Sequence, residues 1–397
     1  MDNIEVLVCD DSSLMRNMIS RIVDSAEGMH TVGTAMNGKF CLQKIPLLKP
    51  DLILLDIEMP EMTGVQFLEE RKKLGIDIPV IILSSIATKG AAVTMQCLEL
   101  GASDFITKPG GSVSVNITSV GSSIIEKIAS YGGKYARAHG KNIASPEVFV
   151  HQAKLKEAEA AAVKEGIISK IKPSETKPEP LPATLWTPPH KEPAVITPLR
   201  QSGPIDVVAL GISTGGPNAL REVFAKIDPK FSKPILVVQH MPAGFTKEFA
   251  ASLDKICPLK VKEAEDGDLI HPGQIYIAPG DFHIVVQKST LCNVIRLSKE
   301  DLRNGHRPSA DVLFESVAKL YKNRALGVIM TGMGRDGAAQ LAEMRKQGAR
   351  TLGQDEKSSI VYGMPRAAWE LGAVQKQVSL ENMAAEMSAV IKEQAGV

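Results

Sequence analysis

The sequence predicts an α/β protein with two doubly wound, parallel-sheet domains joined by a proline-rich linker. Its 397 residues exceed the roughly 100–200 residues of a typical domain. Short apolar runs alternate with amphipathic stretches in two separate regions, a pattern typical of βαβ units. Between these regions, residues 173–204 contain nine of the 24 prolines. Because proline cannot donate to a helix or sheet ladder, we expect an extended linker there.

The first region, residues 1–125, predicts one such domain. Apolar runs predict strands at 4–9, 52–55, 79–83 and 104–107. Their continuous apolar character suits strands that are covered by helices on both faces. Helical patterns lie near 13–25, 38–47, 64–73, 90–100 and 117–131.

The second region, residues 204–397, resumes the alternation after a linker expected at 139–203. An Ala/Glu/Lys-rich stretch near the start of this linker, 151–165, has the composition of a solvated helix. Candidate strands of the second domain lie at 206–211, 234–239, 275–278, 283–287, 326–331 and 349–352. Helical patterns lie at 217–226, 337–347 and 380–394.

Composition excludes several classes of protein. Lys and Arg total 46 against 45 Asp and Glu, so the chain lacks the basic excess of a nucleic-acid-binding protein. The sequence shows no apolar run of about 18 residues and no secretory signal pattern, so we expect a cytoplasmic protein without membrane insertion. Five scattered cysteines without a C-x-x-C pair predict free, buried thiols rather than zinc sites or disulfides.

Polar residues end several strands of the first region, where ligands bind in an open parallel sheet. Three carboxylates at one such edge would repel unless a divalent cation lay among them, and magnesium prefers oxygen ligands. A lysine and a hydroxyl facing the same point would hold a phosphoryl group. Singly, each residue has a structural explanation as a helix N-cap, a strand-end hydroxyl or a solvated charge. The residues concerned are Asp10, Asp11, Asp56 (the expected nucleophile, on the central strand), Ser84 and Lys108.

Residues 4–110 resemble the receiver domain of bacterial response regulators. The resemblance is carried by Asp10-Asp11, Asp56-Ile57-Glu58-Met59-Pro60, Ser84 and Lys108-Pro109. It implies a flavodoxin-like fold, Mg²⁺ as cofactor, and phosphorylation of Asp56 by a histidine kinase. It also implies that the backbone of Glu58 is a further metal ligand and that Phe105 is a rotating switch residue beside Ser84 and Lys108. A plain core position explains Phe105 equally well.

The second region opens with a glycine-rich strand-to-helix turn, Gly211-Ile212-Ser213-Thr214-Gly215-Gly216-Pro217. Such a turn cradles a phosphate with its backbone N–H groups, or exposes a serine where the helix dipole favours an oxyanion. The spacing is not G-x-G-x-x-G. Residues 211–215 fit G-x-S-x-G formally, but so short a motif is weak evidence by itself.

Ser213, His240 and Asp336 each follow a candidate strand of the same sheet. This layout lets a histidine take the serine proton while an aspartate fixes the histidine tautomer. Glycines around Met333 would let backbone N–H groups approach an oxyanion. The alternatives are a structural strand-end histidine and an N-cap role for Asp336 at the helix 337–347. His306 is a weaker candidate for a catalytic residue, since its sequence context is typical of the start of a helix.

Residues 205–395 resemble the chemotaxis-specific protein-glutamate methylesterase family. Five blocks carry the resemblance: 211–217, Gln239-His240-Met241-Pro242, Tyr276-Ile277-Ala278-Pro279-Gly280, His306-Arg307-Pro308-Ser309 and Thr331-Gly332-Met333-Gly334-Arg335-Asp336-Gly337. It implies a Rossmann-like fold distinct from the α/β-hydrolases, without a cofactor in the catalytic domain. It further implies Ser213 as nucleophile, His240 as base, Asp336 as orienting acid, the Met333 amide as oxyanion donor and Thr214 as a lining residue. Asp281 stands where a small residue is expected.

Together the resemblances imply a phosphorylation-activated enzyme of sensory adaptation. It would hydrolyse glutamate γ-methyl esters, and deamidate particular glutamines, on methyl-accepting chemotaxis receptors. Its partners would be these receptors and a chemotaxis histidine kinase, with a monomer as the default state and a receiver that blocks the active site until phosphorylated. Rival interpretations are a serine hydrolase with another acyl substrate and a non-enzymatic binding module. A DNA-binding output has the least support.

Overall fold

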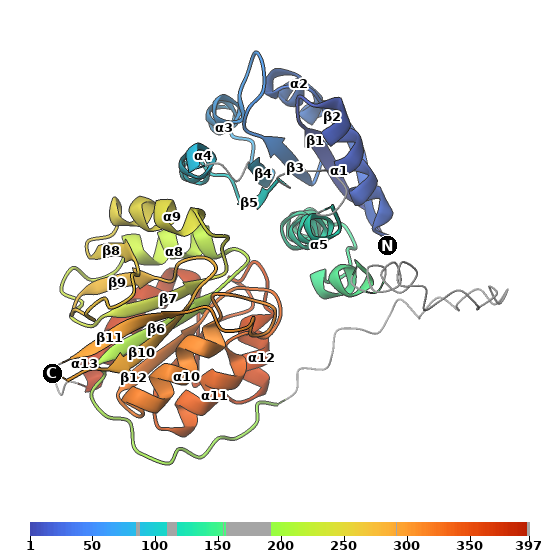
Figure 1. Ribbon diagram of the computed structural model, residues 1–397. Coiled ribbons are helices and arrows are strands. Elements are labelled where there is room, and N and C mark those ends of the chain that lie inside the picture. The colour runs from blue at the N-terminus through green and yellow to red at the C-terminus, as the bar shows by residue number, and fades with distance from the viewer. Residues whose placement is uncertain (85–87, 109–116, 154, 156–191, 291, 395–397) are drawn as a thin grey trace, which may run out of the picture. The chain divides into compact units, whose positions relative to one another are not determined.

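The computed structural model describes residues 1–397 except 85–87, 109–116, 154, 156–191, 291 and 395–397. The chain divides into two compact units, each built on an open parallel sheet (Figure 1). The predicted fold class of two parallel-sheet α/β domains is therefore confirmed. None of the helices among the described residues has the length and apolar character needed to cross a bilayer.

The N-terminal unit has a five-stranded sheet in the order β2-β1-β3-β4-β5. The central strands β3 and β4 are buried along their whole length, which explains their unbroken apolar sequences. The strands are β1 (Ile4–Cys9), β2 (Met29–Ala35), β3 (Leu52–Asp56), β4 (Val80–Ser84) and β5 (Asp104–Thr107). The helices that follow these strands along the chain are α1 (Ser13–Ser25), α2 (Gly38–Leu48), α3 (Gly64–Lys73), α4 (Thr88–Glu99) and α5 (Ile117–Lys127).

Two features of this unit differ from the sequence-based expectation. The edge strand β2 was not predicted, because most of its residues are only partly buried and the segment lacks a continuous apolar run. The helix expected to end near residue 131 continues as a π-helical turn, Ile128–Gly132, and then as α6 (Gly133–Ala138). Glycine is required at 132, since a Cβ there would lie 2.8 Å from the Ile4 side chain.

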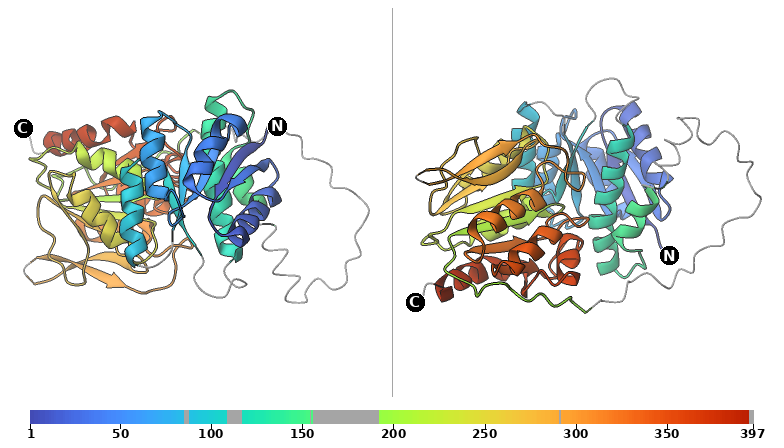
Figure 2. Two further views of the ribbon diagram at one scale, coloured as in Figure 1. Left: turned by 90° about the horizontal axis from the view of Figure 1, so that it is seen from above. Right: turned by 60° about the horizontal axis from the view of Figure 1, so that its bottom comes forward.

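The C-terminal unit has a seven-stranded, all-parallel sheet in the order β14-β13-β12-β6-β7-β9-β8. Helices α8 and α9 lie over one face of the sheet, and α10, α11 and α12 over the other (Figures 1 and 2). The sheet strands are β6 (Val207–Ile212), β7 (Ile235–Gln239), β8 (Lys260–Glu263), β9 (Gln274–Ile277), β12 (Ala325–Ile329), β13 (Arg350–Gln354) and β14 (Lys376–Val378). The helices are α8 (Gly216–Ala225), α9 (Phe245–Asp254), α10 (Ala310–Tyr321), α11 (Ala338–Lys346), α12 (Met364–Glu370) and α13 (Met383–Gln394).

A separate antiparallel hairpin accompanies this sheet. It pairs β10 (His283–Lys288) with β11 (Asn293–Ser298). The sequence predicted β10 but not β11, β8 or β14, since these three are short or mix polar with apolar residues. One cluster of the core packs alternate residues of the sheet strands against the hairpin and helices α10, α11 and α12, and it includes Tyr276, Ile284, Phe314 and Met364.

Both ends of the expected linker make backbone hydrogen bonds to a neighbouring unit. Asn142 accepts from the N–H of Asp2 in the N-terminal unit. Leu199 donates to the carbonyl of Lys346 in the C-terminal unit. Residues 156–191, with most of the proline-rich stretch, lie outside the described residues.

All five cysteines are free, as expected. Cys9, Cys41 and Cys97 are buried. The expectation of burial is wrong for the other two, because Cys257 is half-buried and Cys292 is exposed.

Candidate phosphorylation and catalytic sites

Three carboxylates meet at the carboxyl end of the N-terminal sheet. Asp10 directly follows β1, and Asp56 ends the adjacent strand β3. One carboxylate oxygen from each of Asp10, Asp11 and Asp56 lies within 4.8 Å of the others. A cluster of hard oxygen donors at this spacing fits Mg²⁺, which prefers carboxylate ligands and retains several waters. Ser12, not Asp11, is the N-cap of α1.

Lys108 lies between two of these carboxylates. Its Nζ is 2.8 Å from Asp10 Oδ2 and 2.7 Å from Asp56 Oδ1. Burial would lower the pKa of the lysine, but its hydrogen bonds to Asp10 and Asp56 outweigh this and raise the pKa. Burial raises the pKa of Asp56, although Lys108 works against that shift. The lysine therefore remains a cation beside the predicted nucleophile.

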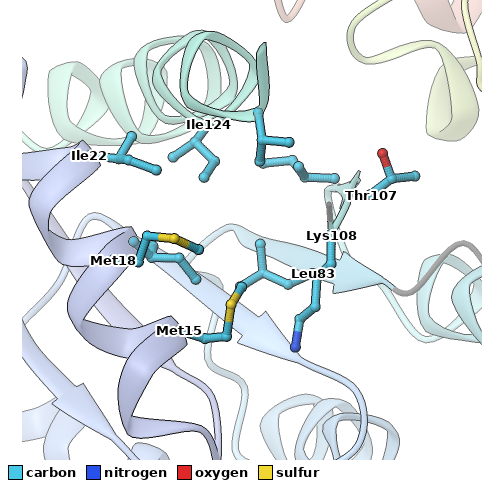
Figure 3. A pocket seen from close by; sticks show the side chains of 10 residues that line it. Met15, Met18, Ile22, Leu83, Thr107, Lys108 and Ile124 are labelled. Atoms are coloured by element: carbon cyan, nitrogen blue, oxygen red, sulfur yellow. The ribbon is translucent and has the colours of Figure 1, made fainter. Parts of the chain in front are cut away.

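An apolar pocket lies beside Lys108. Figure 3 shows Met15, Met18 and Ile22 from α1 on one side of it and Ile124 from α5 on another, with Lys108 at its edge. The lysine stem therefore borders an apolar pocket, while the ammonium group reaches the carboxylates.

Of the remaining predicted residues of this unit, Ser84 and Glu58 lie at the same edge of the sheet, whereas Phe105 pairs with Ile82, two residues before that edge. Ser84 ends β4 and is fully buried, and its carbonyl accepts a 2.6 Å hydrogen bond from the Lys108 N–H. Phe105, in the neighbouring β5, is also buried. The exposed Glu58 follows β3 by two residues.

The second cluster lies where three adjacent strands of the C-terminal sheet end. Ser213 follows β6 by one residue, and His240 follows β7 by one residue. Asp336 lies in the loop between β12 and α11. Because β12, β6 and β7 are neighbours in the sheet, their carboxyl ends bring the three side chains together.

The three side chains form one hydrogen-bonded chain. His240 Nδ1 lies 3.0 Å from Ser213 Oγ, and His240 Nε2 lies 2.8 Å from Asp336 Oδ2. Since an ionised carboxylate only accepts, Nε2 carries the proton and Nδ1 presents its lone pair to the serine. Ser213 is half-buried.

Asp336 is the most strongly hydrogen-bonded member of this chain. The carboxylate is 1% exposed. Burial would raise its pKa, but hydrogen bonds from His240, Ser309 and Asn304 hold the pKa well below its usual range. It also accepts from two backbone N–H groups at the start of α10, those of Ala310 (2.6 Å) and Asp311 (3.3 Å).

The alternative role of Asp336 as the N-cap of the helix predicted at 337–347 is wrong. The N-cap of α11 is Gly337, which has φ +84°. Asp336 instead serves the N-terminus of another helix, α10, whose positive end also favours the ionised carboxylate.

Close backbone packing holds the serine in place. A Cβ at Gly332 would lie 2.7 Å from the Ser213 Cβ, so no larger residue fits there without moving the serine. The Ser213 N–H donates to the carbonyl of Thr331 at 2.9 Å. The side-chain amide of Gln239 donates to the carbonyls of both Ser213 and His240, each at 3.1 Å.

Two predicted lining residues flank the serine. Thr214 is buried, and its carbonyl accepts from the Thr331 hydroxyl at 2.9 Å. Met333 follows Gly332 and is half-buried. Within the described part of the chain, no hydrogen bond from the Met333 N–H is found.

Several residues around the triad were not predicted from the sequence. Asn304 and Ser309 donate to Asp336, at 2.8 and 2.6 Å. The ring of His306 stacks on His240 with the centroids 3.9 Å apart. Of these three residues, only His306 and Ser309 lie in a sequence block that carried the family resemblance. Asp281, the departure noted above, has φ +67° and pairs with Arg307 at 2.7 Å.

Comparisons with known proteins identify the family of each of the two domains. A family model described as CheB methylesterase matches residues 208–387, and one described as response regulator receiver domain matches residues 6–115. The protein-glutamate methylesterase/protein-glutamine glutaminase of Treponema denticola is 53% identical over 394 residues, covering 99% of this chain and 100% of that protein. The proteins of the same name from Treponema pallidum and Bacillus subtilis are 49% and 38% identical, each covering 98% of this chain and 97% and 99% of their own lengths. The chain therefore belongs to the CheB family of protein-glutamate methylesterases/protein-glutamine glutaminases, with a response regulator receiver domain preceding the methylesterase domain.

Proposed function

We propose that this protein hydrolyses glutamate γ-methyl esters, and deamidates particular glutamines, on the cytoplasmic helices of methyl-accepting chemotaxis receptors. The observation that carries the proposal is the hydrogen-bonded chain from Ser213 through His240 to Asp336 at adjacent strand ends. The names of its relatives support glutamate methyl esters and glutamines of proteins as the substrate class, and the sequence resemblance described above supports chemotaxis receptors as the proteins that carry them.

The geometry supports acyl transfer through a serine ester. Ser213 Oγ attacks the ester carbonyl carbon while its proton passes to His240 Nδ1, 3.0 Å away. Asp336 stabilises the resulting imidazolium through Nε2. The Met333 N–H would stabilise the oxyanion.

The intermediate then breaks its bond to methoxide, which takes the proton from Nδ1 and leaves as methanol. Water repeats the sequence on the acyl-serine and releases the glutamate carboxylate. With a glutamine substrate, ammonia leaves in place of methanol.

The receiver domain would regulate this chemistry through phosphorylation of Asp56 by a chemotaxis histidine kinase. Asp10, Asp11, Asp56 and the backbone carbonyl of Glu58 would hold Mg²⁺, which neutralises charge on the transferred phosphoryl group. Lys108, already within 2.8 Å of two of these carboxylates, would pair with the phosphoryl oxygens. The added charge shifts the receiver between two states and so raises esterase activity.

The test is methanol release from membranes that carry methylated chemoreceptors. Wild type and Ser213→Ala are compared, each with and without acetyl phosphate and Mg²⁺. We expect release that depends on Ser213 and increases with the phosphodonor. Release that persists in Ser213→Ala refutes the assignment of Ser213 as nucleophile. If Ser213 is required for hydrolysis of other esters but no methanol is released from the receptors, the receptor substrate alone is refuted.

A further inference from the structure

A tight turn, Arg303–His306, lies against the catalytic cluster. The backbones of Arg303 and His306 exchange hydrogen bonds of 3.1 and 3.0 Å. The two residues between them, Asn304 and Gly305, have φ values of +54° and +82°. Asn-Gly is the pair that such a turn favours, because both central residues need positive φ. The turn therefore presents Asn304 and His306 in a defined geometry.

Asn304 joins two buried carboxylates. Its Nδ2 donates to Asp336 Oδ1 at 2.8 Å and to Asp311 Oδ2 at 2.6 Å. The two acids are 1% and 4% exposed, whereas Asn304 itself is exposed. Its carboxamide thus lies between the acids and solvent, and each of its two N–H groups serves one carboxylate.

Asp311 lies in α10 and Asp336 precedes α11, and each carboxylate accepts a backbone hydrogen bond from the other's helix. Asp336 accepts from the first N–H groups of α10, while Asp311 accepts from the Gln340 N–H at the start of α11, at 3.0 Å. Burial raises the pKa of Asp311, and the nearby charge of Asp336 adds to this effect. A donor between the acids lowers their mutual repulsion.

His306 supplies the second contact of the turn. Its ring lies nearly parallel to that of His240, with an interplanar angle of 13°. A flat ring packed at this distance restricts rotation of the general base and covers one of its faces. His306 is half-buried, so it forms part of the wall between the base and solvent.

We propose that Asn304 and His306, which the turn Arg303–His306 presents, are positioning residues of the catalytic site. Asn304 holds Asp336 ionised and oriented, and His306 holds the His240 ring in line with Ser213. The inference rests on the proposed function, because it assigns these residues a role only through the triad. The charged groups facing the turn are Asp336, Asp311 and His240, together with Arg303 and Arg307, which pair with Glu315 and Asp281.

Four substitutions separate positioning from simple stability. Asn304→Gly removes the carboxamide but keeps a backbone suited to positive φ. Asn304→Asp keeps the shape and adds a third carboxylate. His306→Phe keeps a flat ring, whereas His306→Ala removes it. Arg303→Ala is the matched control, since Arg303 lies in the same turn and pairs with Glu315 on the surface.

The readout is kcat/KM for methanol release from methylated receptor membranes between pH 5 and 9 (roughly the range in which histidine titrates), with the melting temperature of each variant. We expect Asn304→Gly to lower kcat/KM about 10-fold and Asn304→Asp to lower it about 100-fold, since loss of a hydrogen bond to a charged group has effects of this order. In Asn304→Asp the acidic limb of the pH profile should also move to higher pH. His306→Ala should lose about 10-fold and His306→Phe should recover most of it, while Arg303→Ala stays within about twofold of wild type.

Values within twofold of wild type for both Asn304 variants, with an unchanged pH profile, overturn the inference. A drop that parallels the melting temperature alone, without a change in the pH profile of Asn304→Asp, also overturns it. If Asn304→Asp does not fold, Asn304→Ser is measured in its place against the same limits. Ser213→Ala is run alongside: if it stays active, the proposed function fails, and if it is inactive while the turn variants are normal, only this inference fails.

Discussion

Replacing Asp336 by asparagine should switch the tautomer of His240, the proposed general base. Asp336 accepts hydrogen bonds through both oxygens, and an amide must turn its N–H₂ group toward one of these two sets of donors. The orientation that leaves fewer donors unpaired will be favoured. The two orientations differ in what they do to His240.

On the Oδ2 side, the amide would face His240 Nε2 and the Ala310 N–H. The histidine can relieve its contact by moving its proton to Nδ1, which leaves only the Ala310 N–H unpaired. The Nδ1 proton would then point at Ser213, and the base could no longer accept the serine proton.

On the Oδ1 side, the amide would face Ser309 Oγ, Asn304 Nδ2 and the Asp311 N–H. The serine hydroxyl can rotate to accept, but the other two donors stay unpaired. Asn304 cannot turn its amide without losing its bond to Asp311. The amide nitrogen should therefore occupy the Oδ2 side, and the tautomer should change.

The expected loss in kcat is about 10⁴-fold, the effect of the equivalent wrong tautomer in a serine protease triad. One unpaired buried N–H also costs about 1–3 kcal/mol of stability. The assay is methanol release under saturating substrate for wild type, Asp336→Asn and Ser213→Ala, with thermal unfolding of each. A kcat for Asp336→Asn within about 10-fold of wild type would refute the tautomer argument.

The pH dependence of stability provides a second check of this prediction. The pKa of Asp336 is lowered in the folded state. A lowered folded-state pKa stabilises the protein above the unfolded value of about 3.9 and loses this effect as pH falls through the folded value. The difference in melting temperature between wild type and Asp336→Asn should therefore be full near neutral pH and shrink below about pH 4. A difference that grows in acid contradicts the assigned shift.

Three further predictions follow from the two sites. Gly332→Ala should lower kcat about 100-fold or more, since its Cβ would lie 2.7 Å from the Ser213 Cβ and a displacement near 1 Å has effects of this size; a kcat like that of wild type contradicts it. Asp56→Asn should keep basal methanol release but show no rise with acetyl phosphate, and a stimulated variant would exclude Asp56 as the phosphorylated residue. Mg²⁺ at about 100 times its Kd should stabilise the receiver by about 2.7 kcal/mol, and Asp11→Asn should reduce that gain in calorimetry with and without MgCl₂; equal gains in both proteins remove Asp11 from the metal site.

The sequence by itself determined the fold class and the segments that carry the chemistry. Central parallel strands such as β3 and β6 are buried throughout, so their apolar runs are visible without a structure. The polar residue that ends such a run lies at the ligand-binding edge of the sheet. Ser213, His240 and Asp56 were identified in this way, because the relation between a run and its end is local.

Only the tertiary structure decided which groups act on one another. The order β12-β6-β7 brings Asp336 to His240, and the packing of α10 against that loop makes Asp336 serve a helix other than the one that follows it. Edge strands such as β2 were missed because partial burial gives them no continuous apolar run. The contacts of Asn304 and His306 depend on where one tight turn meets residues more than 30 and 60 positions away. No local pattern encodes such contacts, since they arise from the path of the whole chain.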